Sequence, residues 1–228
     1  MNIDICCKGK LIKALSYTYP STPQPPNQSI DISNWSKVRY ATRCYMKYNY
    51  NSFSFIPYAE YSNSKKVVIL LESPHKDEFD DNFNPLIPLN GASGRKFDSN
   101  IINRMNIWFS GHIVENQIFE IILYNPVPYQ TSLYHFLSNK ISYQPLIGSP
   151  SVMPKIALDA KLRNEVWKAL FNLPCCNRYF EYWLKKNKPD YIINCCTGIK
   201  GKNYLNFNIG IKYRRIQKSG NLKTIVRT

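Results

Sequence analysis

Short apolar runs alternate with amphipathic segments through most of this chain. Three runs rich in Val, Ile and Leu are short and end near Pro or Gly, which is typical of buried strands: 66–71, 119–124 and 190–195. Apolar residues recur at spacings of three and four in segments that predict helices: 95–109, 155–173 and, shorter, 178–186. This alternation predicts a three-layer α/β/α fold with a mostly parallel central sheet.

The N-terminal part is less regular. The Pro-rich piece 19–26 cannot be a helix or a central strand, and it reads either as an arm wrapping the domain or as a loose leader. The Tyr-rich stretch 35–62 is ambiguous between helix and strand. We therefore expect an N-terminal extension, 1–65, packed on an α/β domain, 66–228.

The net charge and the apolar content of the chain limit the kinds of partner that it can have. Lys and Arg number 30 against 15 Asp and Glu, a formal charge of +15, and no acid follows Asp190. Such an excess predicts a polyanionic partner, most commonly nucleic acid, although a solvated Lys-rich surface would look the same. No apolar run reaches the roughly 18–20 residues that span a bilayer, and the N-terminus lacks a secretory pattern. We expect a cytoplasmic protein without a membrane partner.

The cysteines do not indicate a metal. Seven are present, six of them in adjacent pairs at 6–7, 175–176 and 195–196. Neither a disulfide framework nor zinc spacing has this pattern, so we expect reduced thiols, no metal and no cofactor.

Polar residues gather just after the first buried strand. Glu72, Ser73, His75 and Asp77 follow it, and 88–94 (Pro-Leu-Asn-Gly-Ala-Ser-Gly) opens the next helix. Ligands of open α/β sheets bind beyond the carboxyl ends of strands. A carboxylate there could stabilise an oxocarbenium ion or orient a water, and amides at a Gly-Ser-Gly turn could hold an anion. The chemistry is therefore expected here.

Four motifs in order resemble the uracil-DNA glycosylase superfamily, in its compact members. Residues 71–75 match the family's G-E-A-P-G at Glu72 and Pro74, and 88–98 match P-F-x-G-x-[AS]-G-x-x-L-D at Pro88, Gly91, Ser93, Gly94 and Asp98. The strand ending at Asn125 is similar to the one whose Asn reads the base, and 176–198 resembles the family's late helix, strand and glycine.

Candidate roles come from the matching positions and from the charged residues near them or in the basic C-terminal stretch. The catalytic candidates are Glu72 first, then Asp77 and His75, with Glu78 as a further carboxylate. Asp77 and Glu78 could instead only cap a turn. Glu72 could be a buried scaffold residue rather than the catalyst. The base-binding candidates are Ser73, Leu89 and Asn125, the last of which could be only a turn former. The DNA-binding candidates are Gly91, Ser93, Gly94, Arg95, Lys96, Arg214 and Arg215.

Departures from the family pattern shift the expected substrate. Ser73 stands at the place of the water-activating Asp, Leu89 (or Pro88, with a shifted register) at the stacking aromatic, and His75 at a Tyr that excludes 5-substituted pyrimidines. The late His-Pro-Ser loop is not visible, and 212–215 is a possible replacement. Cys176 lies near a cluster-ligand position of compact relatives, but their Cys-x-x-Cys is missing, so no iron–sulfur cluster is expected.

The expected function is therefore hydrolysis of a base–sugar bond. We expect a monomeric, monofunctional DNA glycosylase that flips a base out of DNA and leaves an abasic site. A modified pyrimidine, such as a 5-substituted cytosine of phage DNA, is favoured over uracil, which suggests a defence role. The alternatives are a non-catalytic nucleic-acid-binding module on the same fold and a different α/β hydrolase acting on a nucleotide.

Overall fold

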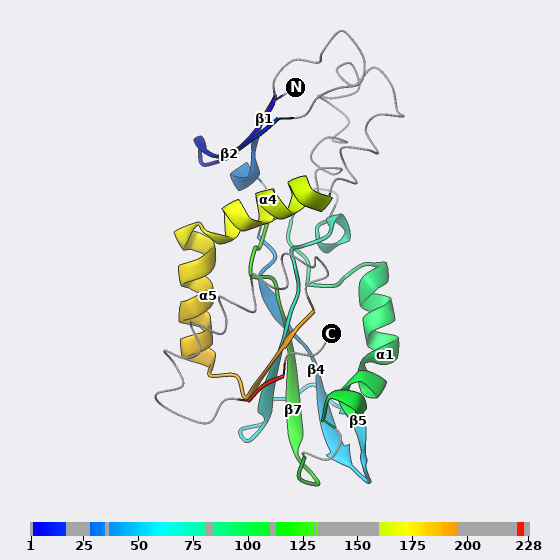
Figure 1. Cartoon of the computed structure of the whole chain (residues 1–228). Helices are drawn as coiled ribbons and strands as arrows, with labels where there is room; N and C mark the ends of the chain where they lie inside the picture. Colours follow the sequence, from blue (N-terminus) through cyan, green and yellow to red (C-terminus); the bar gives the residue numbers. More distant parts are fainter. Residues whose placement is uncertain are drawn as a thin grey trace.

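The computed structural model of the protein describes residues 2–16, 28–34, 37–80, 84–109, 113–129, 131, 160–195 and 223–225. Its largest element is a mixed sheet in the order β5-β4-β7-β6-β8-β9 (Figure 1). The strands are β4 (Tyr40–Asn49), β5 (Ser52–Ile56), β6 (Lys65–Leu70), β7 (Ile118–Tyr124), β8 (Tyr191–Asn194) and β9 (Lys223–Ile225). The helices are α1 (Ala92–Phe109), α4 (Ala160–Phe171) and α5 (Pro174–Asn187).

The sheet is parallel at its centre and antiparallel on one side. β6 pairs with β7 and β8 in parallel, and β8 pairs with β9 in parallel. β4 runs antiparallel to both β7 and β5. The β4–β5 hairpin turns at Tyr50 and Asn51, both with positive φ, and the Glu115 carboxylate accepts their two backbone N–H groups at 3.0 and 3.3 Å. Such left-handed two-residue turns match the twist of paired strands.

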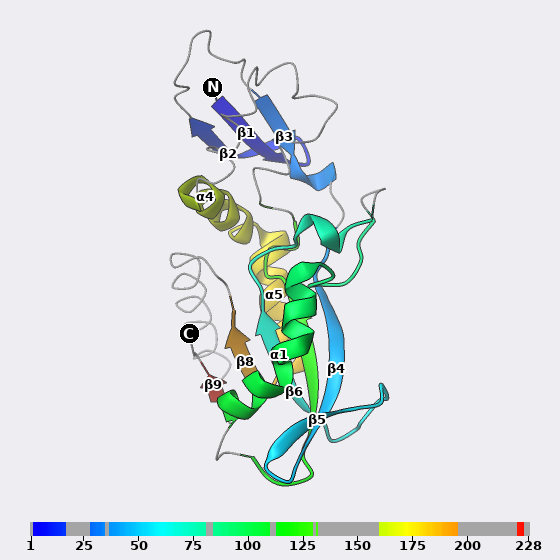
Figure 2. The same cartoon turned by 90° about the vertical axis from the view of Figure 1, so that its right-hand side faces the viewer.

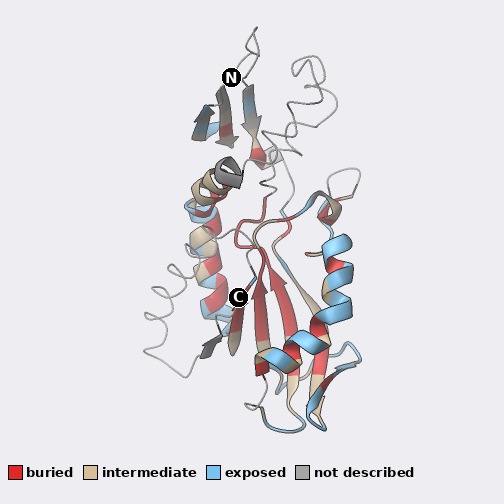
Figure 3. Cartoon of the chain, turned by 45° about the vertical axis from the view of Figure 1, so that its right-hand side comes forward, coloured by how far each residue is buried: buried red, intermediate tan, exposed pale blue. Residues whose placement is uncertain are grey.

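Each face of the sheet is covered by a different helix. On one face Ile101, Met105 and Phe109 of α1 join alternate residues of β6 and β7 in one buried cluster. On the other face Tyr124 of β7 contacts Phe180 and Trp183 of α5, with ring centroids 5.1 and 4.7 Å apart. Figure 1 shows α1 and α5 on opposite sides of the sheet. Because both faces are covered, the central strands are buried along most of their length, and Figure 3 shows them as the core.

A second, smaller sheet lies at one end of the molecule, next to α4 (Figure 2). It has the order β2-β1-β3, formed by β1 (Asn2–Cys7), β2 (Lys10–Ser16) and β3 (Gln28–Asp31). The Asp31 carboxylate accepts N–H groups of Lys8 and Gly9 at the β1–β2 turn. These hydrogen bonds join β3 to that turn, and the Lys13–Glu165 ion pair of 3.2 Å joins β2 to α4.

The structure confirms a mixed α/β fold, and the three predicted strands and both helical periodicities reappear as β6, β7, β8, α1 and α4. The third helix begins earlier than predicted, because Pro174 starts it as its first residue, a position that proline favours. The expected extension 1–65 does not form one unit. Residues 2–34 contain the small sheet and the 3₁₀ helix η1 (Ile32–Asn34), whereas β4 and β5 belong to the main sheet because they pair with β7 and with each other.

The described helices are all shorter or more polar than a membrane span requires. The Pro-rich piece 19–26 lies outside the described residues, as does most of the segment after Cys195.

We expect residues on the buried face of α1 to contribute more to the stability of the main sheet than residues on its exposed face. Replacement of Met105, which has no exposed surface, by Ala should lower the free energy of unfolding by about 2–5 kcal/mol, because it removes contacts and leaves a cavity. Ile107→Ala is the matched control on the same helix. Ile107 is 48% exposed, so its replacement should change stability by about 0.5 kcal/mol or less. Urea unfolding of the three proteins measures both; equal losses would contradict the assigned face.

Candidate functional site

The strand order defines one position where a ligand crevice can open. From β6 the chain passes through α1 to β7 on one side, and from β7 it returns through α4 and α5 to β8 on the other side. Along the chain β6 is followed by β7 on one side, and β8 is followed by β9 on the other side, so the strand order reverses between the neighbours β6 and β8. In open α/β sheets ligands bind at such a switch point, beyond the carboxyl ends of the strands. We call this place, where residues 71–78 follow β6 and Cys195 follows β8, the switch-point edge.

Backbone hydrogen bonds continue past the strand ends and hold this edge in place. Leu71 N–H donates to the Tyr124 carbonyl at 2.8 Å, and Cys195 N–H donates to the Leu70 carbonyl at 2.9 Å. The indole N–H of the buried Trp167 donates to the Glu72 carbonyl at 2.6 Å. The backbone of Glu72 is thus fixed by α4, while its side chain is only partly buried at the rim.

The hydroxyl of Ser73, one of the expected base-binding groups, contacts another hydroxyl. Its Oγ lies 2.7 Å from Oγ1 of Thr131, which is 1% exposed. The pair connects the segment after β6 to the segment after β7. Ser73 therefore holds two loops of the edge together in this conformation.

His75 and Asp77 form a second pair at the start of the loop. Nδ1 of His75 lies 3.4 Å from Oδ2 of Asp77, and both side chains are well exposed. The 3₁₀ helix η2 (Lys76–Glu78) carries Asp77 and brings its carboxylate against Gly91. The backbone carbonyl of Asp77 accepts a side-chain N–H of Asn90 at 3.1 Å. The structure thus brings two of the expected catalytic groups together and places them beside the glycine turn.

Glu78 is the buried acid of the site. It is 2% exposed, and its carboxylate accepts His75 N–H and Asn125 Nδ2 at 3.2 Å each, with a further backbone hydrogen bond from Leu89. Burial raises the pKa of Glu78 above its ordinary value, and the three donors act against that rise. These contacts give Glu78 the role of a scaffold that closes the loop 75–89 onto β7.

Asn125 is entirely buried at the end of β7. Its Nδ2 donates to the Val38 carbonyl at 3.0 Å and to Glu78, and its backbone N–H donates to the Arg39 carbonyl at 2.6 Å. Both side-chain donor hydrogens are therefore used inside the protein, while Oδ1 has no hydrogen-bond partner. To read a base, the Asn125 amide would first have to leave these contacts.

The glycine turn before α1 is constrained at two positions. A Cβ at Gly94 would overlap the Leu89 carbonyl oxygen, and a Cβ at Gly91 would overlap the Asp77 carboxylate. Leu89 itself has φ +57° and packs its side chain against the core cluster. The N–H groups of Gly94 and Arg95 donate to the Gly91 carbonyl at 2.9 and 3.2 Å. Gly91 and Gly94 are thus required by close packing, and two of the expected phosphate-binding amides already have partners.

The structure describes only some of the expected DNA-binding residues. Ser93, Arg95 and Lys96 are exposed on the first turn of α1, on the outside of the molecule. Asp98, which the motif included, pairs with Arg43 of β4, whose Nε lies 2.8 Å from Oδ1. Arg214 and Arg215 lie outside the described residues.

Three residues of this region were missed by sequence reasoning. Trp167, Thr131 and Arg43 contact site residues that are 95, 58 and 55 positions away in the chain. No local pattern could have indicated them, because each belongs to a different element of the fold. Within the described residues, no group of three or more His, Cys, Asp or Glu side chains could hold a metal ion.

Comparison of the chain with protein-family models, curated proteins and solved structures finds no match.

Gly94 offers a test of the turn geometry. Gly94→Ala should destabilise the protein by about 1–3 kcal/mol, because the added methyl group overlaps the Leu89 carbonyl and the backbone must shift. Ser93→Ala, at the neighbouring exposed position, should change stability by about 0.5 kcal/mol or less. Thermal or urea unfolding distinguishes them, and a neutral Gly94→Ala would contradict the close approach.

The buried Glu78 should make stability depend on pH. Because its pKa is raised in the folded state, its contribution is fully present below the ordinary glutamate pKa and is lost as pH rises through the raised pKa. The Glu78→Gln variant lacks this titration. The stability of the wild type relative to the variant should therefore fall as pH increases from about 4 to neutrality. Urea unfolding at a series of pH values measures it; a constant difference would show that the pKa is not raised.

Proposed function

We propose that this protein is a monofunctional DNA glycosylase, with its site at the switch-point edge and a modified pyrimidine as its substrate. The observation that carries the proposal is the position of Glu72: a partly exposed carboxylate, fixed through its backbone at the carboxyl end of β6, at the point where the strand order reverses. Ligands of open α/β sheets bind at such a point. The resemblance of four motifs to the uracil-DNA glycosylase superfamily and the charge of +15 support it.

The residues divide into a reactive acid and supporting groups. Of the three carboxylates after β6, Glu78 is enclosed, Asp77 pairs with His75 and lies against Gly91, and Glu72 is partly exposed. We assign the reactive role to Glu72, which directly follows the strand. In the proposed reaction a water oxygen bonds to C1′ of the sugar, and the N-glycosidic bond breaks. The base departs with the electron pair of that bond. Glu72 stabilises the oxocarbenium character and takes the proton that the water loses.

His75 and Asp77 are proposed to contact the flipped base or its sugar from the exposed side of the loop. Nδ1 of the imidazole accepts the Asp77 backbone N–H at 3.4 Å, which leaves Nε2–H as the group that can donate a hydrogen bond to the base. His75 stands where the family has a Tyr, and Leu89 stands where it has a stacking aromatic residue. This favours a pocket that admits a substituent on the 5-position, as in hydroxymethylated or glucosylated cytosine. Such bases occur in phage DNA, so defence is the proposed setting.

A non-catalytic nucleic-acid-binding module is the second candidate. The contact between Ser73 and Thr131 favours it, because the position expected to carry a water-activating acid holds a hydroxyl that joins two loops. Its DNA affinity would come from Arg95, Lys96 and the other basic residues, and would fall steeply with salt.

Duplex oligonucleotides containing uracil, hypoxanthine, 5-hydroxymethylcytosine or its glucosylated form test the two functions. We expect alkali-dependent strand cleavage at a 5-substituted cytosine. Glu72→Gln should reduce it about 100-fold or more, because the carboxylate is lost, while salt-sensitive DNA binding is retained. Glu60→Gln, in an exposed loop of the main sheet, is the control and should keep full activity.

The opposite results are equally informative. Uracil cleaved much faster than every 5-substituted cytosine would overturn the substrate assignment. Tight binding at low salt with no abasic site in any oligonucleotide would favour the binding module instead.

A further inference from the structure

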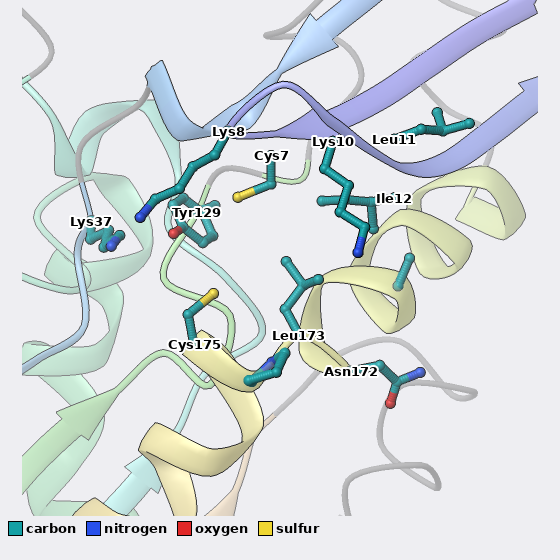
Figure 4. Close-up of a pocket in the computed structure, with 12 residues that line it drawn as sticks. Cys7, Lys8, Lys10, Leu11, Ile12, Lys37, Tyr129, Asn172, Leu173 and Cys175 are labelled. Carbon is teal, nitrogen blue, oxygen red and sulfur yellow. The ribbon is translucent and has the colours of Figure 1, made fainter.

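A cavity of about 660 Å³ lies away from the switch-point edge, between the small sheet and the α4–α5 junction (Figure 4). The β1–β2 hairpin lines one side, the start of α5 lines the other, and Lys37 and Tyr129 close a third. Its volume is within the range of pockets that hold small molecules. Nothing in the proposed glycosylase reaction uses it.

Two thiols from different elements point into this cavity. Figure 4 shows Cys7 of β1 and Cys175 of α5 directed toward its interior. Cys176 follows directly, and its Sγ lies 4.0 Å from Sγ of Cys175. All three are free thiols. The cavity therefore contains nucleophilic groups beside apolar residues such as Ile12 and Leu173, and Cys175 is exposed to solvent there.

The charged groups that face these thiols are mostly positive. Lys8 and Lys10 reach the cavity from the hairpin, and Lys37 reaches it from the segment before β4. Behind them, Arg39 donates to the Cys175 carbonyl at 3.0 Å. Among the described residues, Asp31 is an acid that acts on Cys7, and its carboxylate is already engaged with the Lys8–Gly9 turn and Ser33. A ligand that carries carboxylates would be attracted here.

The two thiols differ in ionisation. The hydrogen bond from Cys176 lowers the pKa of Cys175 to about 6, with help from the Tyr129 hydroxyl and from the charges of Lys37 and Arg39. Burial raises the pKa of Cys7, so that thiol stays protonated. Near neutral pH Cys175 is thus the nucleophile of the cavity, and its place in the first turn of α5 has the same effect.

We propose that this cavity is a thiol-exchange site, in which Cys175 reacts with a small carboxylate-bearing disulfide of the glutathione disulfide type, held by Lys8, Lys10 and Lys37. The Cys175 sulfur attacks one sulfur of the disulfide, and the bond between the two disulfide sulfurs breaks. The products are a mixed disulfide on Cys175 and one released thiolate, so electrons balance without another reactant. Cys7, being protonated, is a poor attacking group and leaves the mixed disulfide in place.

The test is site-resolved mass spectrometry of the full chain incubated with glutathione disulfide. Cys175 and Cys195 are both exposed. We expect Cys175 to gain one glutathione about tenfold or more faster than Cys195, because the pKa of the Cys175 thiol is lowered and Lys8, Lys10 and Lys37 lie around it. Cys175→Ser should abolish the fast reaction and Cys7→Ser should retain it. Fast modification of Cys195 or Cys6 at the rate of Cys175 would overturn the proposal.

A comparison of two disulfide reagents separates charge attraction from simple reactivity. Lys8→Gln and Lys37→Gln should slow the reaction of Cys175 with an anionic aromatic disulfide about tenfold. At a pH where the thiol is ionised in every variant, an uncharged dipyridyl disulfide should react almost unchanged. Lys96→Gln, on the exposed surface of α1, is the matched control and should affect neither. Equal slowing of both reagents, or of neither, would show that the lysines do not bind the ligand.

Discussion

The parallel pairing of β6 with β7 on one edge and β8 on the other is the constraint on which the rest of this structure depends. Residues 67–70 have no exposed surface, so this strand can lie only at the centre of the sheet, under α1 on one face and α5 on the other. Once it is there, the polar residues that follow must emerge beside the end of β8. The location of the candidate site is a consequence of burying four apolar residues.

The loop after β6 is held by a buried polar network rather than by apolar packing. Enclosing the carboxylate of Glu78 costs free energy, which the N–H donors of His75, Leu89 and Asn125 offset. The network joins the loop to β7 and, through Asn125, to the segment before β4. Glu72 and His75, by contrast, keep part of their surface exposed beside this network.

The small N-terminal sheet adds a surface that the main domain lacks. Its hairpin brings Cys7, Lys8 and Lys10 over the first turn of α5. The cations and the helix terminus act in the same direction on Cys175, because both stabilise negative charge. The carboxylates of the switch-point edge and the thiols of the cavity therefore belong to different parts of the fold.

Local patterns in the sequence determined the elements whose burial is uniform. The β-branched run at 66–71 and the spacing of Ile101 and Met105 predicted β6 and α1, because burial on two faces or on one stripe leaves a period in the sequence. The Tyr-rich segment that became β4 has no such period. It is mostly half-buried, and its partner β7 is far away in the chain.

Side-chain roles depended on the tertiary structure. The sequence placed three acids after β6 but could not rank their burial. Glu78 is enclosed, and Asn125 donates to its carboxylate. Glu72 is only partly buried, and Trp167 donates to its backbone carbonyl. The same holds for Asn125, whose amide donates inward, and for Cys7 and Cys175, which only the packing of two sheets brings to one cavity. Composition and period report how much of a segment is buried, whereas the partner of each polar group is decided by the topology that joins distant segments.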